Sequence, residues 1–181
     1  SICSGTATAP ITVNSTVVGT SYSWTAVCPV GNVNPCPVAP GSANPIPAVT
    51  FMNATNNVQT VTYSITSSFN GCAGNTVTHD VIINPSPSVS NFPLEQTICS
   101  GSTSTLVNLT ATVLGTTFTW TASTISPISG FTASGTNQIP AQTLTITPGN
   151  SGFVTYHIIP SFGGSTSCPG APVDYLIHVN P

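Results

Sequence analysis

The sequence contains no lysine and no arginine, and its acidic residues are limited to Asp80, Glu95 and Asp174. Charged residues make up 2% of the chain, whereas a soluble domain normally contains about a quarter. Without cationic side chains the chain has no means of neutralising phosphate groups, so we expect no nucleic-acid partner and no polybasic contact with a membrane surface. Phosphoryl transfer that relies on Lys or Arg clamps is excluded for the same reason.

Long apolar runs are also missing, and we therefore expect no membrane insertion. Hydrophobic residues nevertheless form 39% of the chain, which is enough for packed cores, and Ser and Thr together supply 53 of the 181 residues. This hydrophobic content, combined with a low net charge, argues against intrinsic disorder. The composition therefore predicts a folded protein whose polar surface is built mainly from hydroxyl groups.

An internal repeat organises the chain. The segment 2–5 (ICSG) recurs at 98–101, and the segment 18–26 (VGTSYSWTA) recurs as LGTTFTWTA at 114–122, both at an offset of 96. We therefore expect two homologous modules, residues 1–87 and residues 88–181. The prolines at the junction favour a short, stiff connector. The first module begins without the lead-in that precedes the second, so we expect a segment of a longer array.

Within each module the apolar residues recur with period two, which is typical of strands with one buried face. We expect an all-β protein made of two tandem immunoglobulin-like antiparallel β-sandwiches, because each module has about 95 residues, frequent Pro and Gly, and a central Trp-containing strand. The aromatic residues expected in the two cores are Trp24, Tyr63, Trp120 and Tyr156.

Six cysteines without catalytic or metal-binding spacing indicate disulfides and an oxidising compartment. Cys3 and Cys72 are 69 residues apart, and so are Cys99 and Cys168, which favours one bond within each module. The remaining pair, Cys28–Cys36, lies in an insertion that has no cysteine counterpart in the second module. We therefore expect all six cysteines to be oxidised.

The ICSG opening, the aromatic-x-Trp strand, the segment VTYSIT, the segment NGCAG and the segment IINPSP resemble the PKD-like, immunoglobulin-type repeats of very large Bacteroidetes surface proteins, such as the SprB-like gliding adhesins. The resemblance covers both modules. It implies a filamentous adhesin at the cell surface or outside the cell, built from many tandem modules. The signature WDFGDG of ordinary PKD domains is absent.

Few residues suggest chemistry. His79 precedes Asp80, but the repeat places His79 where the second module has Tyr175, and we expect a half-buried structural histidine. His157 and His178 align with no histidine of the first module. We therefore expect no catalytic residues, no enzyme activity, no cofactor and no metal site built from side chains.

Two features of the sequence suggest sites for sugars. Trp24 and Trp120 could present rings to sugars, but a Trp in this strand of a sandwich normally packs in the core. Asn14, Asn53 and Asn108 match the pattern for N-glycosylation, which also arises by chance in a chain so rich in Ser and Thr.

The preferred functional hypothesis is a stiff, disulfide-stapled spacer in an extracellular fibre or adhesin. Its partners would be neighbouring identical or homologous modules, with surface glycans as a further partner. The alternative hypothesis is a secreted carbohydrate-binding β-sandwich module.

Overall fold

The computed structural model describes residues 1–36, 40–163 and 166–181. These residues form strands connected by turns, with no helix among them, as the period-two pattern predicts. They divide into two compact units. The first unit is Ser1–Ser86 together with a short segment that ends at Cys168, and the second consists of Pro87–Gly163 and Pro169–Pro181. The division between the units falls one residue before the expected module boundary.

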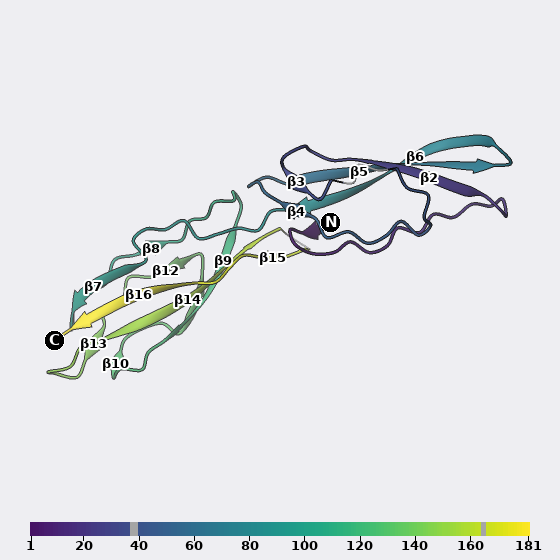
Figure 1. Ribbon diagram of the computed structural model, residues 1–181. Coiled ribbons are helices and arrows are strands. Elements are labelled where there is room, and N and C mark those ends of the chain that lie inside the picture. Colours follow the sequence, from purple (N-terminus) through teal and green to yellow (C-terminus); the bar gives the residue numbers. More distant parts are fainter. Residues whose placement is uncertain (37–39, 164–165) are drawn as a thin grey trace. The chain divides into compact units, whose positions relative to one another are not determined.

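The first unit is built on a four-stranded sheet with the order β1-β6-β5-β2, and β3 and β4 form a separate pair. Their bounds are β1 Ile2–Cys3, β2 Ser21–Val27, β3 Val33–Asn34, β4 Met52–Asn53, β5 Gln59–Phe69 and β6 Cys72–Asn84. The long strands β5 and β6 are joined by Asn70 and Gly71, whose φ angles of 49° and 79° suit a tight two-residue hairpin. In Figure 1 this turn lies at one end of the unit, and the N-terminus lies at the other end, beside β4.

The second unit is built on a larger sheet with the order β11-β9-β14-β16-β7, and β15 pairs with β14. The strands of this sheet are β7 Glu95–Cys99, β9 Thr117–Ser123, β11 Ser134–Thr136, β14 Gly152–Phe162, β15 Cys168–Pro169 and β16 Val173–Asn180. Two short pairs complete the unit, formed by β8 Val107–Asn108 with β12 Gln138–Ile139 and by β10 Ile128–Ser129 with β13 Thr145–Ile146.

Each unit has its own hydrophobic core, because alternate residues of the long strands point to the same face. In the first unit the most deeply buried side chains are Ile46, Phe51, Val61, Tyr63 and Ile83. In the second unit the core joins the inner face of the large sheet to side chains of the short pairs, namely Ile128, Ile139, Leu144, Ile146, Val154, Tyr156, Ile158, Ile177 and Val179. The two-layer arrangement is the β-sandwich that the sequence predicts.

Strand register repeats between the units. Ile2 pairs with Ile83 in the first unit, and Ile98 pairs with Val179 in the second, in both cases between parallel strands. These pairs are related by the same offset of 96 residues. The sequence repeat is therefore a structural repeat, and residues at matching positions can be compared directly.

Candidate functional site

The cysteines depart most from the sequence-based expectation. Cys3 forms a disulfide with Cys168, and the expected bonds Cys3–Cys72 and Cys99–Cys168 are not formed. Cys72 and Cys99 are free, exposed thiols. Two of the three expected pairings are therefore wrong, and within a single chain Cys72 and Cys99 are not oxidised.

The position of Cys72 on β6 explains why Cys3–Cys72 does not form. Cys3 pairs in register with Asn84, the last residue of β6, whereas Cys72 is the first residue of that strand. Twelve residues of extended chain span about 40 Å, and a disulfide requires Cα atoms less than about 7 Å apart.

The same reasoning excludes Cys99–Cys168 in the second unit. Cys99 pairs with Asn180 near the Gly152 end of β14. Gly170, two residues after Cys168, donates its backbone N–H to the carbonyl of Pro160 near the other end of β14. The eight residues between Gly152 and Pro160 correspond to about 26 Å of strand. Equal spacing in the sequence therefore reflects the repeat and not a bond within each module.

The disulfide Cys28–Cys36 is present, as the position of both cysteines in a single insertion predicts. Cys28 is 7% exposed and belongs to the first hydrophobic core, and Cys36 packs against that core. This bond therefore attaches the start of the insertion to the buried side of the unit.

The tryptophans lie where the alternation places them, but they are covered to different degrees. Trp120 is 3% exposed, and its Nε1 donates to the carbonyl of Gln138 at 2.9 Å. Trp24 is only partly buried, and its Nε1 donates to the carbonyl of Ala43 at 3.3 Å. In both units the indole meets a buried tyrosine edge-on, with ring centroids 5.8 Å apart for Trp24 and Tyr63 and 5.4 Å apart for Trp120 and Tyr156. Both rings are packed against the cores, and the buried ring of Trp120 offers no open platform for a sugar.

The three candidate glycosylation residues differ in accessibility. Asn53 is 9% exposed, and its Nδ2 donates to the carbonyls of Asn57 at 2.8 Å and Ile83 at 3.1 Å. The amide nitrogen that a glycan would occupy is thus engaged inside the protein, and Asn53 is not a glycosylation site in the folded chain. Asn14 and Asn108 are exposed.

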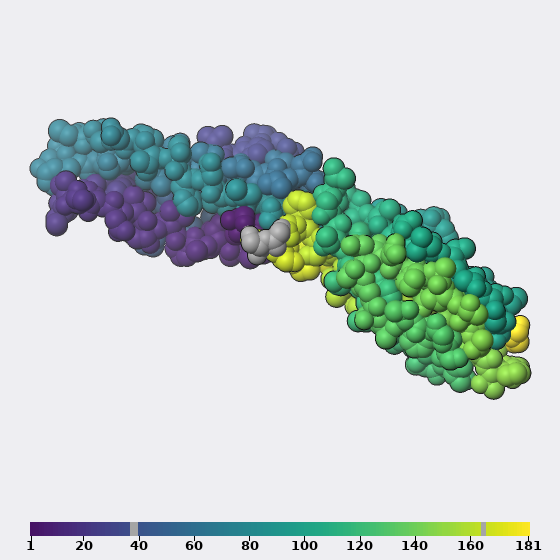
Figure 2. Space-filling model, turned by 180° about the vertical axis from the view of Figure 1, so that it is seen from behind, coloured from purple at the N-terminus to yellow at the C-terminus, as the bar shows by residue number. Residues whose placement is uncertain are grey.

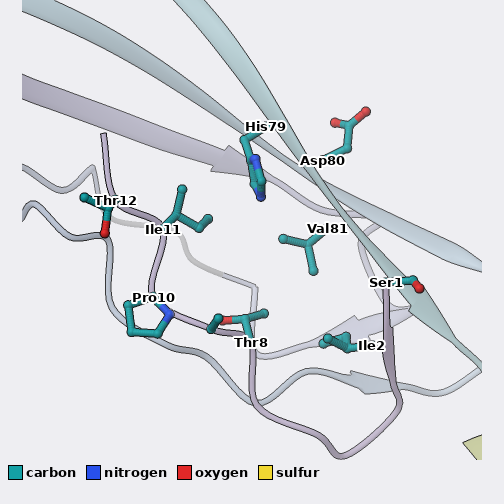
Figure 3. A pocket seen from close by; sticks show the side chains of 10 residues that line it. Ser1, Ile2, Thr8, Pro10, Ile11, Thr12, His79, Asp80 and Val81 are labelled. Atoms are coloured by element: carbon teal, nitrogen blue, oxygen red, sulfur yellow. The ribbon is translucent and has the colours of Figure 1, made fainter. Parts of the chain in front are cut away.

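His79 is not the half-buried structural residue that the repeat predicts. It is exposed and lines a cavity of about 490 Å³ together with Ser1, Ile2, the segment 8–12, Asp80 and Val81. Figure 3 shows the imidazole of His79 directed into this cavity and the carboxylate of Asp80 directed away from it. Adjacent residues of a strand point to opposite faces, and Asp80 accepts a hydrogen bond from the Thr62 hydroxyl at 2.7 Å. The two residues do not form a catalytic pair.

The second unit differs from the first at the place of this cavity. There, β7 pairs with β16 from Glu95–Leu176 to Cys99–Asn180, whereas β1 pairs with β6 over two residues. Leu176 is the equivalent of Asp80. At the corresponding place in the second unit β7 lies beside β16, and the cavity beside His79 lies along the edge of the first sheet.

The outer face of the second sheet carries a row of polar residues that the sequence analysis did not identify. Thr121, His157 and Asp174 are cross-strand neighbours on β9, β14 and β16. His157 Nδ1 lies 2.8 Å from an Asp174 carboxylate oxygen, and both side chains are half exposed. His178 and Glu95 form a second exposed contact at 3.5 Å. Register across three strands brings these residues together, and no signal in the linear sequence reports it. Thr121 and His157 line a small hollow of about 60 Å³, and the side chains of His157 and Asp174 are open to water.

Among the residues that the structure describes, no group of three or more His, Cys, Asp or Glu side chains is arranged to hold a metal ion. Nor is there, in this part of the chain, a helix that is long and apolar enough to span a membrane.

No curated protein matches this sequence. A family model described as a PKD-like domain matches residues 1–87 and, a second time, residues 96–181. With the two disulfides, the match indicates a structural module of extracellular type. The chain belongs to the PKD-like domain family and contains two tandem copies of the domain.

Proposed function

We propose that the chain is a structural repeat segment of an extracellular filamentous adhesin or surface fibre, of the kind exemplified by the SprB-like gliding adhesins of Bacteroidetes. In this role each PKD-like domain acts as a spacer that extends the fibre, and adhesion is performed elsewhere in the assembly.

The observation that carries this proposal is the bond between Cys3 and Cys168. It links a cysteine at the start of the first sequence repeat to a cysteine near the end of the second, a separation of 165 residues. Tension applied at residues 1 and 181 would pass through this bond and would bypass residues 4–167, which hold the buried residues of the first core and those of the second core except the β16 residues Tyr175, Ile177 and Val179. A spacer under load benefits from such a covalent path, because the folded domains are then not required to resist unfolding.

The composition also supports a spacer. Exposed strand edges in soluble proteins are often blunted by Lys, which is absent here. In a fibre, neighbouring domains with so few charged residues can pack closely without burying an unpaired charge.

Immunogold electron microscopy of intact source cells, with an antibody raised against this chain, tests the proposal. We expect gold particles along filaments that project from the cell surface. Label confined to the cell interior, or found on a released protein of two domains only, would contradict the fibre role. Strong binding to specific sugars on a glycan array, combined with the absence of labelled filaments, would favour the alternative of a carbohydrate-binding module.

A further inference from the structure

The two free cysteines are the repeat equivalents of the two bonded ones. Cys99 corresponds to Cys3, and Cys72 corresponds to Cys168, both at the offset of 96. The observed bond therefore joins the opening cysteine of one repeat to the hairpin cysteine of the following repeat. We propose that Cys72 and Cys99 are the open ends of a head-to-tail disulfide series, in which Cys99 bonds to Cys72 of another copy of this repeat pair. This inference rests on the proposed role as a repeat segment of a fibre.

Cys99 is held in the same backbone setting as Cys3. Each cysteine is followed by Ser-Gly, and the glycine has a φ of 82° in both repeats. The turn closes in the same way, because the residue three positions after the cysteine donates its N–H to the cysteine carbonyl at 3.0 Å in both cases. The serine N–H that follows each cysteine donates to the carbonyl of the matching asparagine, at 2.9 Å for Ser4–Asn84 and 2.7 Å for Ser100–Asn180. A hairpin cysteine that fits beside Cys3 would therefore meet the same backbone beside Cys99.

Cys72 lies beside an exposed apolar surface. It lines a cavity of about 300 Å³ with Val17 and Phe69, which are 48% and 42% exposed. The teal atoms of the β5–β6 hairpin, which carries Cys72, lie at one end of the first unit in Figure 2. In an isolated spacer this apolar surface would serve no packing purpose.

Two residues of the equivalent surface in the second repeat, Val113 and Cys168, are buried. Val113 corresponds to Val17, and its carbonyl accepts a hydrogen bond from the Thr116 hydroxyl at 2.7 Å, as the carbonyl of Val17 does from Thr20 at the same distance. Yet Val113 is 2% exposed. Cys168 itself is 1% exposed, whereas Cys72 is exposed. In the second repeat the segment 88–90 hydrogen-bonds to Thr110 and Thr112 beside Val113, and Cys3 is bonded to Cys168. The occupant that fits is the Cys-Ser-Gly opening of another copy.

The bond forms by ordinary thiol–disulfide exchange with a disulfide-bearing oxidant, such as an oxidoreductase or oxidised glutathione. The Cys72 thiolate attacks the oxidant disulfide and forms a mixed disulfide, which releases one thiol of the oxidant. The Cys99 thiolate of the second copy then attacks Cys72 Sγ and displaces the other. Two protons and two electrons pass from the two cysteine thiols to the oxidant, which is reduced to the dithiol. Unpaired cysteines in a protein of oxidising compartments are commonly partners in intermolecular bonds.

Two single-cysteine variants of the full chain test the proposal. Cys72→Ser retains the free Cys99, and Cys99→Ser retains the free Cys72, while both keep Cys3–Cys168. Each variant alone, and an equimolar mixture, is equilibrated at several hundred micromolar in a buffer of reduced and oxidised glutathione. Products are then resolved by non-reducing electrophoresis and mapped by mass spectrometry of the linked peptides. We expect at least tenfold more covalent dimer in the mixture than in either variant alone, with Cys99–Cys72 as the linking bond.

A surface variant separates docking from simple thiol reactivity. Val17→Asp in the Cys99→Ser background places a charge beside Cys72 and should lower the yield of mixed dimer several-fold. Val30→Asp is the matched control, because Val30 is 92% exposed and follows the end of β2 that is remote from the hairpin turn. A carboxylate beside Cys72 disfavours its thiolate, so each dimer yield is divided by the variant's own rate of reaction with a small neutral thiol reagent before the two variants are compared.

Equal dimer yields in the single-variant samples and the mixture would overturn the proposal, as would a mixture that stays monomeric. A Cys72–Cys99 bond within one molecule of the unmodified chain would also overturn it. Each of these results would leave the immunogold experiment unaffected, so that failure of the covalent series and failure of the fibre role are distinguishable. Labelled filaments whose repeats carry free thiols at these positions would keep the spacer and reject the series.

Discussion

Gly135 lies directly opposite Trp120 across the β11–β9 pair, and the indole of Trp120 occupies the space in which a side chain at Gly135 would lie. A Cβ atom added to Gly135 would come 2.4 Å from Cζ2 of Trp120. The first unit contains the same arrangement, in which a Cβ at Gly41 would lie 2.0 Å from Cζ2 of Trp24. Both units therefore use a glycine to let the chain pass over the tryptophan ring.

We predict that Gly135→Ala destabilises the second unit by about 1–3 kcal/mol, because the new methyl group must displace a buried indole. Urea unfolding followed by tryptophan fluorescence measures this. Ser134→Ala is the control, since Ser134 is exposed on the same strand and a surface change of this size should alter stability by less than about 0.5 kcal/mol. Equal effects of the two substitutions would show that the ring is free to move.

The tryptophans should differ in access to a quencher. Trp120→Phe leaves Trp24 as the fluorophore, and Trp24→Phe leaves Trp120. Because Trp24 is partly buried and Trp120 is 3% exposed, acrylamide should quench Trp24 with the larger Stern–Volmer constant. Circular dichroism of both variants checks that each remains folded. Equal quenching constants would contradict the difference in burial.

Mechanical pulling should report the path of force through Cys3–Cys168. When the oxidised chain is held at its two ends, the residues under tension are 1–3 and 168–181, and they extend to at most about 60 Å. After reduction the whole chain can be stretched, to an extended length of about 650 Å. Cys3→Ser should give nearly the reduced value even under oxidising conditions.

The matched control in this experiment is the double substitution Cys28→Ser with Cys36→Ser. It opens a loop of eight residues by sequence separation, but this loop lies within the part that the Cys3–Cys168 bond bypasses. The oxidised double variant should therefore extend no further than the oxidised parent chain. Long unfolding steps in the oxidised parent would contradict the assigned bond.

Stability should fall at high pH because of buried tyrosines. Burial raises the pKa of Tyr156 above its usual 10, and a hydrogen bond that the Gln142 amide donates to its hydroxyl at 2.9 Å opposes this in part. Burial also raises the pKa of Tyr63. These tyrosine hydroxyls therefore ionise at a lower pH in the unfolded chain than in the folded chain. Their contribution to the free energy of unfolding is complete below about pH 10 and is lost as pH rises through their folded-state pKa.

Tyr156→Phe in a Trp24→Phe background isolates this effect in the second unit. Urea midpoints measured through Trp120 at pH 7, 9, 10 and 11 should fall less steeply above pH 10 than those of the chain that retains Tyr156. The substitution also removes a partner of Gln142, so the slope with pH and not the value at pH 7 is the readout. Identical slopes would mean that Tyr156 ionises equally in both states.

The sequence by itself determined the class of fold and the repeat. Alternation such as Val61, Tyr63 and Ile65 has period two, and period two follows from the geometry of any extended strand. These three side chains are 0%, 1% and 4% exposed in the structure. Identical segments at an offset of 96 residues similarly require identical local structure, which the matching registers of β1 with β6 and of β7 with β16 show.

The exposure of single residues could not be predicted from the sequence in the same way. His79 follows the same alternation as Val81, yet it is exposed, on the part of β6 that lies beyond the two-residue pairing with β1. Asn53 matches a glycosylation pattern, yet hydrogen bonds across the unit bury its amide. Both outcomes depend on which strand lies beside which, and local sequence carries no information on that.

The tertiary structure alone decided the cysteine pairing. A spacing of 69 residues in both repeats indicates that the cysteines occupy equivalent positions. It does not indicate that the two cysteines of one repeat lie close enough to form a bond. Cys72 begins β6, and Cys3 lies beside the last residue of that strand. The length of one strand therefore separates them, and Cys3 bonds instead to Cys168 of the following repeat. A disulfide depends on distance in space, and in a repeat protein the cysteine that is close in space belongs to the neighbouring repeat.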